Sequence, residues 1–67
     1  MAKIQLNGKK ISIKSNFSIQ DLLKKYKLIN KKIAIEHNGT IVSKINYKKR
    51  YLKNEDKVEI VHFIGGG

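Results

Sequence analysis

The sequence predicts a small α+β domain, with a mixed sheet of four to five strands and one main helix packed on one face. Two Asn-Gly pairs each join segments in which apolar and polar residues alternate, a pattern typical of β-hairpins. Between these segments lies one stretch with the apolar spacing of a helix. A sequence of 67 residues predicts a single domain.

The first predicted element is a β-hairpin over residues 3–14. Ile4 and Leu6 alternate with polar residues, and the alternation resumes after Asn7-Gly8. This dipeptide suits a type I′ turn, because both central residues of that turn need a positive φ.

A helix is predicted over residues 19–27. Ser18 and Asp21 have the spacing of a capping box, in which each side chain accepts a backbone N–H that the helix leaves free. Phe17 and Leu22 have the spacing of a hydrophobic staple. One apolar stripe follows at helical spacing, formed by Ile19, Leu22, Leu23 and Tyr26.

The second half of the sequence begins with a predicted strand over residues 32–37. The second Asn-Gly pair then predicts a turn into a short strand around residues 41–42. Residues 43–53 have no clean period, so we expect an irregular stretch or a single helical turn. Four apolar side chains are candidates to anchor this stretch, namely Ile45, Tyr47, Tyr51 and Leu52.

The last predicted strand covers residues 58–64, after a turn at residues 54–56. It is apolar on both faces, which places it in the centre of the sheet, beside the first strand. A hairpin, a helix and a central final strand together predict the β-grasp (ubiquitin-like) arrangement. We expect one β-grasp domain over residues 1–64 and a flexible C-terminal glycine tail over residues 65–67.

Composition excludes several classes of site. The sequence has no cysteine, which removes disulfides, zinc–thiolate sites and thiol nucleophiles. His37 and His62 lack neighbours at metal-ligand spacing, so no metal site is expected. No run of 18 apolar residues and no secretory signal is present, so we expect a cytoplasmic protein without a membrane span.

The formal net charge of +10 raises the possibility of nucleic-acid binding. The strongest candidate is the basic run 48–50, which Tyr47 and Tyr51 flank. Fourteen of the 15 basic residues are lysine, however, and a solvated lysine face is the commoner origin of such a run. Nucleic acid is therefore not the expected partner.

The three terminal glycines, Gly65, Gly66 and Gly67, follow the last predicted strand without a linker. Glycine adds no packing and costs the most backbone entropy to order, so it is a poor structural ending. A glycine tail can instead thread a channel that is too narrow for any Cβ. Its carboxylate, once activated by ATP as an acyl-adenylate, can pass to a nucleophile such as sulfide. The alternative is a frayed end or a cloning remnant.

Four segments together carry a family resemblance, namely residues 4–8, 18–23, 33–39 and, most specifically, 55–67. On these residues the whole chain resembles the family of the sulfur carrier protein of thiamine thiazole biosynthesis, ThiS. The chain departs from the family at Glu55, where the family often has glycine. We expect Asn54 or Glu55 to form this tight turn, since Asn tolerates a positive φ.

The resemblance implies that Gly67 carries first an adenylate and then a thiocarboxylate, and that Gly65 and Gly66 thread the partner's active site. It also implies three partners: an E1-like adenylating enzyme, a sulfur-donating cysteine desulfurase relay and a thiazole synthase. The chain itself is then a carrier and not an enzyme. It binds no cofactor, and the activating enzyme uses the ATP.

Alternation in the last strand predicts a docking surface. If Val58 and Ile60 face the helix, then Val61 and Phe63 face solvent beside the tail, where they can anchor a partner. The alternative is that a nearby loop covers these two side chains.

Three other functions fit parts of the pattern. A molybdopterin-synthase small subunit uses the same carrier chemistry on another pathway, and a ubiquitin-like modifier transfers its terminal glycine to lysine amines. A basic β-grasp module that binds RNA is the alternative from a different class.

Overall fold

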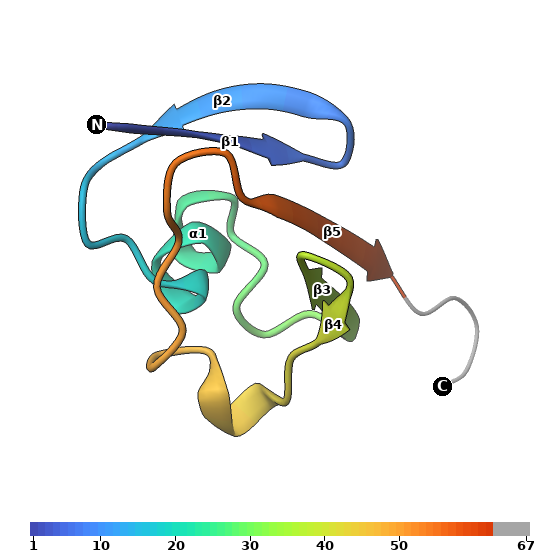
Figure 1. Ribbon diagram of the computed structural model, residues 1–67. Coiled ribbons are helices and arrows are strands. Elements are labelled where there is room, and N and C mark those ends of the chain that lie inside the picture. The colour runs from blue at the N-terminus through green and yellow to red at the C-terminus, as the bar shows by residue number, and fades with distance from the viewer. Residues whose placement is uncertain (63–67) are drawn as a thin grey trace.

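The computed structural model describes residues 1–62, which form one sheet with a helix against one face (Figure 1). The elements are β1 (Ala2–Leu6), β2 (Lys9–Ile13), α1 (Ile19–Lys25), β3 (Ile33–His37), β4 (Thr40–Ile41), the short 3-10 helix η1 (Lys44–Asn46) and β5 (Lys57–His62). The strand order is β2-β1-β5-β3-β4, in which β1 and β5 run parallel and the other neighbours antiparallel. The predicted fold class is confirmed, with the last strand central and beside the first.

Both predicted Asn-Gly turns have the backbone that the sequence suggests. Asn7 and Gly8 have φ values of 49° and 86°, and Asn38 and Gly39 have values of 52° and 85°. Two consecutive positive φ angles define the type I′ turn, whose twist matches that of the strands it joins. Each turn joins its strands with two residues only.

The N-terminus of α1 has the predicted capping box. The Ser18 hydroxyl accepts the Asp21 N–H, and the Asp21 carboxylate accepts the Ser18 N–H, both at 3.0 Å. Phe17, the residue predicted to form the staple, packs partly buried against the core.

The C-terminus of α1 comes two residues earlier than predicted. Lys27 has a φ of 59°, so the chain turns left-handed there. The Lys27 N–H donates to the Lys24 carbonyl at 3.1 Å and the Leu28 N–H to the Leu23 carbonyl at 2.7 Å, the two bonds of a Schellman motif. Tyr26, the last residue of the predicted apolar stripe, lies at this cap and is 41% exposed, so it does not pack with the other three.

The core fills the space between α1 and the inner face of the sheet. Its side chains come from β1, β2, β3, β5, the helix and the segment between β4 and β5: Ile4, Ile13, Ile19, Leu22, Leu23, Ile35, Val42, Tyr47, Leu52, Val58 and Ile60. None of the helices in residues 1–62 is long and apolar enough to cross a membrane.

The segment predicted to be irregular contains one turn of 3-10 helix, η1, as expected. Two of its four predicted anchors, Tyr47 and Leu52, are buried. The prediction is wrong for Ile45 and Tyr51, which are exposed by 79% and 53%. Only part of this segment reaches the core, because its backbone also has to follow the start of α1.

The carbonyls of this segment satisfy the first N–H groups of α1. The Ile19 N–H donates to the Arg50 carbonyl at 2.9 Å, and the Gln20 N–H to the Tyr47 carbonyl at 3.1 Å. Without these acceptors the two donors lack intrahelical partners. The irregular segment therefore completes the helix start that Ser18 begins.

Candidate functional site

The site is built around β5, the strand that leads to the predicted tail. On one side β3 pairs with it over five residues, from His37 opposite Val58 to Ile33 opposite His62. On the other side β1 pairs with it over two residues only, and β5 runs on beyond the hairpin (Figure 1). The end of β5 is therefore supported mainly from one side.

A side chain extends the support on the β1 side by one step. The Asn7 N–H donates to the Val58 carbonyl at 2.9 Å, and the Asn7 Oδ1 accepts the Ile60 N–H at 2.7 Å. Because β1 turns away at Asn7, its amide side chain takes the place of the next backbone acceptor of the ladder.

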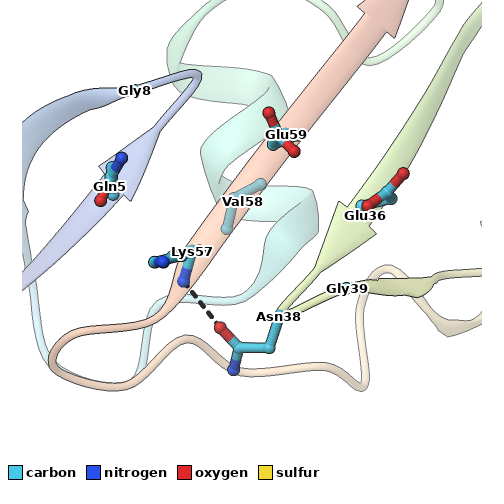
Figure 2. Close-up of a pocket in the computed structure, with 8 residues that line it drawn as sticks. All are labelled: Gln5, Gly8, Glu36, Asn38, Gly39, Lys57, Val58 and Glu59. Atoms are coloured by element: carbon cyan, nitrogen blue, oxygen red, sulfur yellow. Dashed lines mark hydrogen bonds between the residues drawn. The ribbon is translucent and has the colours of Figure 1, made fainter.

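The start of β5 is held by a second, larger set of contacts. The Lys57 N–H donates to Asn38 Oδ1 at 2.7 Å (Figure 2), and Asn38 Nδ2 donates to Asp56 Oδ1 at 3.0 Å. The other Asp56 oxygen lies 2.7 Å from His37 Nε2 and accepts the Lys53 N–H at 2.8 Å. The β3–β4 turn, the loop before β5 and β5 itself are tied together at this carboxylate.

These contacts determine the ionisation of Asp56. Partial burial raises the pKa of this carboxyl, but hydrogen bonds from Asn38, His37 and the Lys53 backbone outweigh burial, and the pKa lies below its ordinary value. An ionised carboxylate accepts hydrogen bonds only, so His37 donates from Nε2.

Sequence reasoning missed the role of His37. The sequence analysis considered this histidine only as a metal ligand, whereas its side chain is nearly buried and pairs with Asp56, 19 residues away. The available signal was its position, two residues after the inward-facing Ile35, which places it on the core side of β3.

The tight turn before β5 uses Glu55, one of the two residues expected there. Glu55 has a φ of 71°, and its N–H donates to the Lys3 carbonyl at 2.6 Å. Asn54 Oδ1 accepts the Lys3 N–H at 2.8 Å. Glutamate at position 55 therefore adopts the positive φ that this turn requires.

The outer face of the sheet, opposite α1, has the orientation that alternation predicts. Val58 and Ile60 are buried toward the helix, and Val61 is 57% exposed on the other side. Phe63, the second predicted docking residue, lies outside the described residues, as do Gly65, Gly66 and Gly67. Residue 64, the predicted end of the domain, also lies outside them.

Figure 2 looks onto this outer face, with α1 behind the sheet. A hollow of about 580 Å³ lies between the two Asn-Gly turns and over the first half of β5. Polar side chains from three strands line most of it, including Gln5, Glu36, Lys57 and Glu59. Its open walls, which mix polar and apolar surface, suit contact with another protein surface more than enclosure of a small molecule.

Only one of the two tyrosines that flank the basic run 48–50 is exposed. Tyr47 is 8% exposed and belongs to the core, so its ring is not available to stack on a base. Tyr51 is exposed. Within residues 1–62, no group of three or more His, Asp or Glu side chains is placed to hold a metal ion.

Taken together, a mixed five-stranded sheet with β5 central and one helix across its inner face is the β-grasp, ubiquitin-like fold. A crystal structure of a thiamine biosynthesis protein (ThiS) from Geobacter metallireducens superimposes with a TM-score of 0.83 at 25% identity, covering 97% of this chain and 99% of that one.

The ThiS family model matches residues 3–67. The chain is 46% identical over 65 residues to the sulfur carrier protein ThiS of Bacillus subtilis, covering 96% of this chain and 98% of the relative. It is also 37% identical over 65 residues to a thiazole synthase of Magnetococcus marinus, of which it matches 20%. The chain belongs to the ThiS family, the family of the sulfur carrier of thiamine biosynthesis.

Proposed function

We propose that this protein carries sulfur as a thiocarboxylate on Gly67 and donates it to the thiazole ring of thiamine. The observation that carries the proposal is the family match, which extends through residue 67 and so includes the three glycines. The absence of cysteine agrees with it, because no internal thiol competes for an activated terminus.

The chemistry takes two steps at the terminal carboxyl group. A carboxylate oxygen of Gly67 attacks the α-phosphate of ATP, which forms the acyl-adenylate and releases pyrophosphate. Sulfide (HS⁻) then attacks the acyl carbon, AMP leaves with the oxygen that bound it, and the sulfide proton is released. Where the relay delivers the sulfur as a persulfide, AMP leaves in the same way, and a thiol reductant then cleaves the S–S bond of the acyl disulfide to leave the thiocarboxylate. The product holds one sulfur atom in place of one oxygen.

The protein contributes a folded domain that partners can bind, and it does no catalysis of its own. The proposed binding domain is the β-grasp domain, residues 1–64, and the proposed tail is residues 65–67. Gly65 and Gly66 have no side chains, so they can pass through a channel that leads to a partner's active site. The contacts of Asn7 and Asn38 with β5 support this role, because they fix the strand from which the tail continues.

Three partners follow from this function: an E1-like adenylating enzyme, a cysteine desulfurase relay and a thiazole synthase. The thiazole synthase of Magnetococcus marinus supports the last of these, since its own chain contains a segment similar to this protein. Val61 and Phe63 are the proposed docking residues, and the exposure of Val61 supports that proposal. We place the protein in the cytoplasm, with its partners.

Intact mass spectrometry tests the proposed function. The protein is incubated with ATP, the adenylating enzyme and a sulfur source, and its mass is expected to rise by the difference between sulfur and oxygen. A variant that lacks Gly67 is expected to show no change in mass and the same unfolding midpoint as the intact protein. An unchanged mass of the intact protein, or sulfur on the shortened variant, would contradict the proposal.

A further inference from the structure

The outer face of the sheet carries an unusual group of side chains next to β5. Glu36 and Glu59 are direct partners in the β3–β5 register, so their side chains stand beside each other on the same face (Figure 2). Ile41 is the partner of Glu36 on the other side, and Ala34 is the partner of Val61. We call these five residues the acid–apolar patch.

The position of the two glutamates is not explained by the fold. The sequence has five acidic residues against 15 basic ones. Asp21 caps α1, Asp56 holds the start of β5, and Glu55 forms the tight turn. The remaining two are placed directly opposite each other, an arrangement in which like charges destabilise a sheet.

No lysine among residues 1–62 forms an ion pair with either glutamate. The structure shows no ion pair and no side-chain hydrogen bond for Glu36 or Glu59 with any of residues 1–62. Lys57 lies on the same face of β5, two residues before Glu59, but makes no ion pair with it. In a chain with a charge of +10, this face therefore keeps a local negative site.

Exposed apolar side chains border the negative site. Ile41 is 64% exposed and Val61 57%, although both lie in strands of the sheet. On their other side, the two glutamates line the hollow described above, which extends to both Asn-Gly turns. A surface that combines two carboxylates with exposed aliphatic groups is complementary to an arginine set among apolar residues.

Resting on the proposed function, we infer that the acid–apolar patch docks the adenylating enzyme, and that Glu36 and Glu59 together bind one of its arginines. A guanidinium group donates in a planar fork, so it can bridge two adjacent carboxylates. It is also more weakly hydrated than an ammonium group, which suits burial between Ile41 and Val61.

Distance and charge favour the adenylating enzyme as the occupant. Five residues follow His62 in the sequence, and five residues span at most about 18 Å even when fully extended. The surface that receives the patch is therefore close to the site where the terminal carboxylate meets ATP. An enzyme that binds a triphosphate and a carboxylate there carries positive charge, which repels a carrier of charge +10 except at its negative site.

The test compares carrier variants as substrates of the adenylating enzyme. The Glu36→Gln/Glu59→Gln double variant keeps the shape of both side chains and removes both charges. We expect its KM to rise about tenfold, the scale of one buried charged hydrogen bond, with kcat changed less than twofold. Its unfolding midpoint should stay the same or rise, because the repulsion between the carboxylates is gone.

A matched control separates the patch from net charge. Glu59→Gln and Glu55→Gln change the charge by the same amount, but Glu55 lies in the turn and outside the patch. We expect Glu59→Gln to raise KM at least threefold and Glu55→Gln less than 1.5-fold. Equal effects of the two variants, or a KM of the double variant within twofold of the parent, would overturn the inference.

Failure of this inference is distinguishable from failure of the proposed function. If the parent gains sulfur and the double variant is adenylated equally well, only the patch assignment is wrong. If the parent is not adenylated, the affinity of the parent and of the double variant for the adenylating enzyme is measured directly. Equal affinities would overturn the assignment of the patch. A larger effect on sulfur transfer to the thiazole synthase than on adenylation would assign the patch to that enzyme and overturn this assignment.

Discussion

The two Asn-Gly turns have the same dipeptide and the same type of backbone, yet their asparagine side chains support β5 in different ways. Asn38 accepts the Lys57 N–H at the start of β5 and donates to the Asp56 carboxylate. Asn7 makes one side-chain bond, to the Ile60 N–H, nearer the end of the strand. The turn type alone therefore does not determine what each turn contributes.

The difference lies in what surrounds each asparagine. Asn38 joins a network with His37 and Asp56, in which one partner is charged and the histidine is nearly buried. Asn7 stands at the point where β1 leaves β5, without a charged partner among the described residues. We therefore expect the Asn38 side to supply most of the stability, and the Asn7 side to control the direction of the strand.

The largest expected effect comes from Asn38→Gly. Glycine keeps the positive φ of the turn but removes two side-chain hydrogen bonds, one of them to a carboxylate, at a cost of about 2 kcal/mol in the free energy of unfolding. Urea unfolding measures this loss. Asn16→Gly is the matched control, because Asn16 also has a positive φ and is exposed. Equal losses for the two variants would show that the side-chain contacts of Asn38 contribute nothing.

A smaller effect is expected from Asn7→Gly, which removes one bond, at a cost of about 1 kcal/mol. Asn7→Asp keeps an acceptor for the Ile60 N–H and tolerates the positive φ, so we expect a loss below about 0.5 kcal/mol. Amide hydrogen exchange gives the local readout, with faster exchange of the Ile60 N–H expected for Asn7→Gly. Unchanged exchange there would contradict the role of the Asn7 side chain.

The smallest expected effect is the loss of stability in acid that Asp56, the charged partner of Asn38, contributes. Because the folded pKa of Asp56 lies below its ordinary value of 3.8, ionised Asp56 stabilises the fold. This contribution is complete above that value and is lost as the pH falls from it through the folded pKa. Urea midpoints measured across this range should fall for the parent and fall less for Asp56→Asn. The same slope for both proteins would assign the acid sensitivity to other carboxylates.

Elements that depend only on residues close together along the chain were predictable from the sequence. The capping box and the two type I′ turns need only local residue types, and all three form as predicted. The end of α1 was not predictable by the usual signal, because a lysine and not a glycine takes the left-handed position at residue 27. The anchors in residues 43–53 were half right, since no periodicity indicates which side chains turn inward there.

The candidate site also has one feature that the sequence predicted and contacts that it did not. The outward orientation of Val61 followed from period-two alternation in β5. The contact of His37 with Asp56 joins residues 19 positions apart, and that of Asn7 with Ile60 joins residues 53 apart. Neither spacing forms a motif, so only the assembled sheet shows these contacts.

By itself, the sequence determined the order of elements, the central place of the last strand and the glycine ending, because these depend on local propensity and alternation. The tertiary structure decided how β5 is held and which charges meet on the outer face of the sheet. Strand register is the physical reason. Residues distant along the chain become neighbours only when the strands pair, and that pairing places Glu36 opposite Glu59 and Asn7 beside the backbone of Ile60.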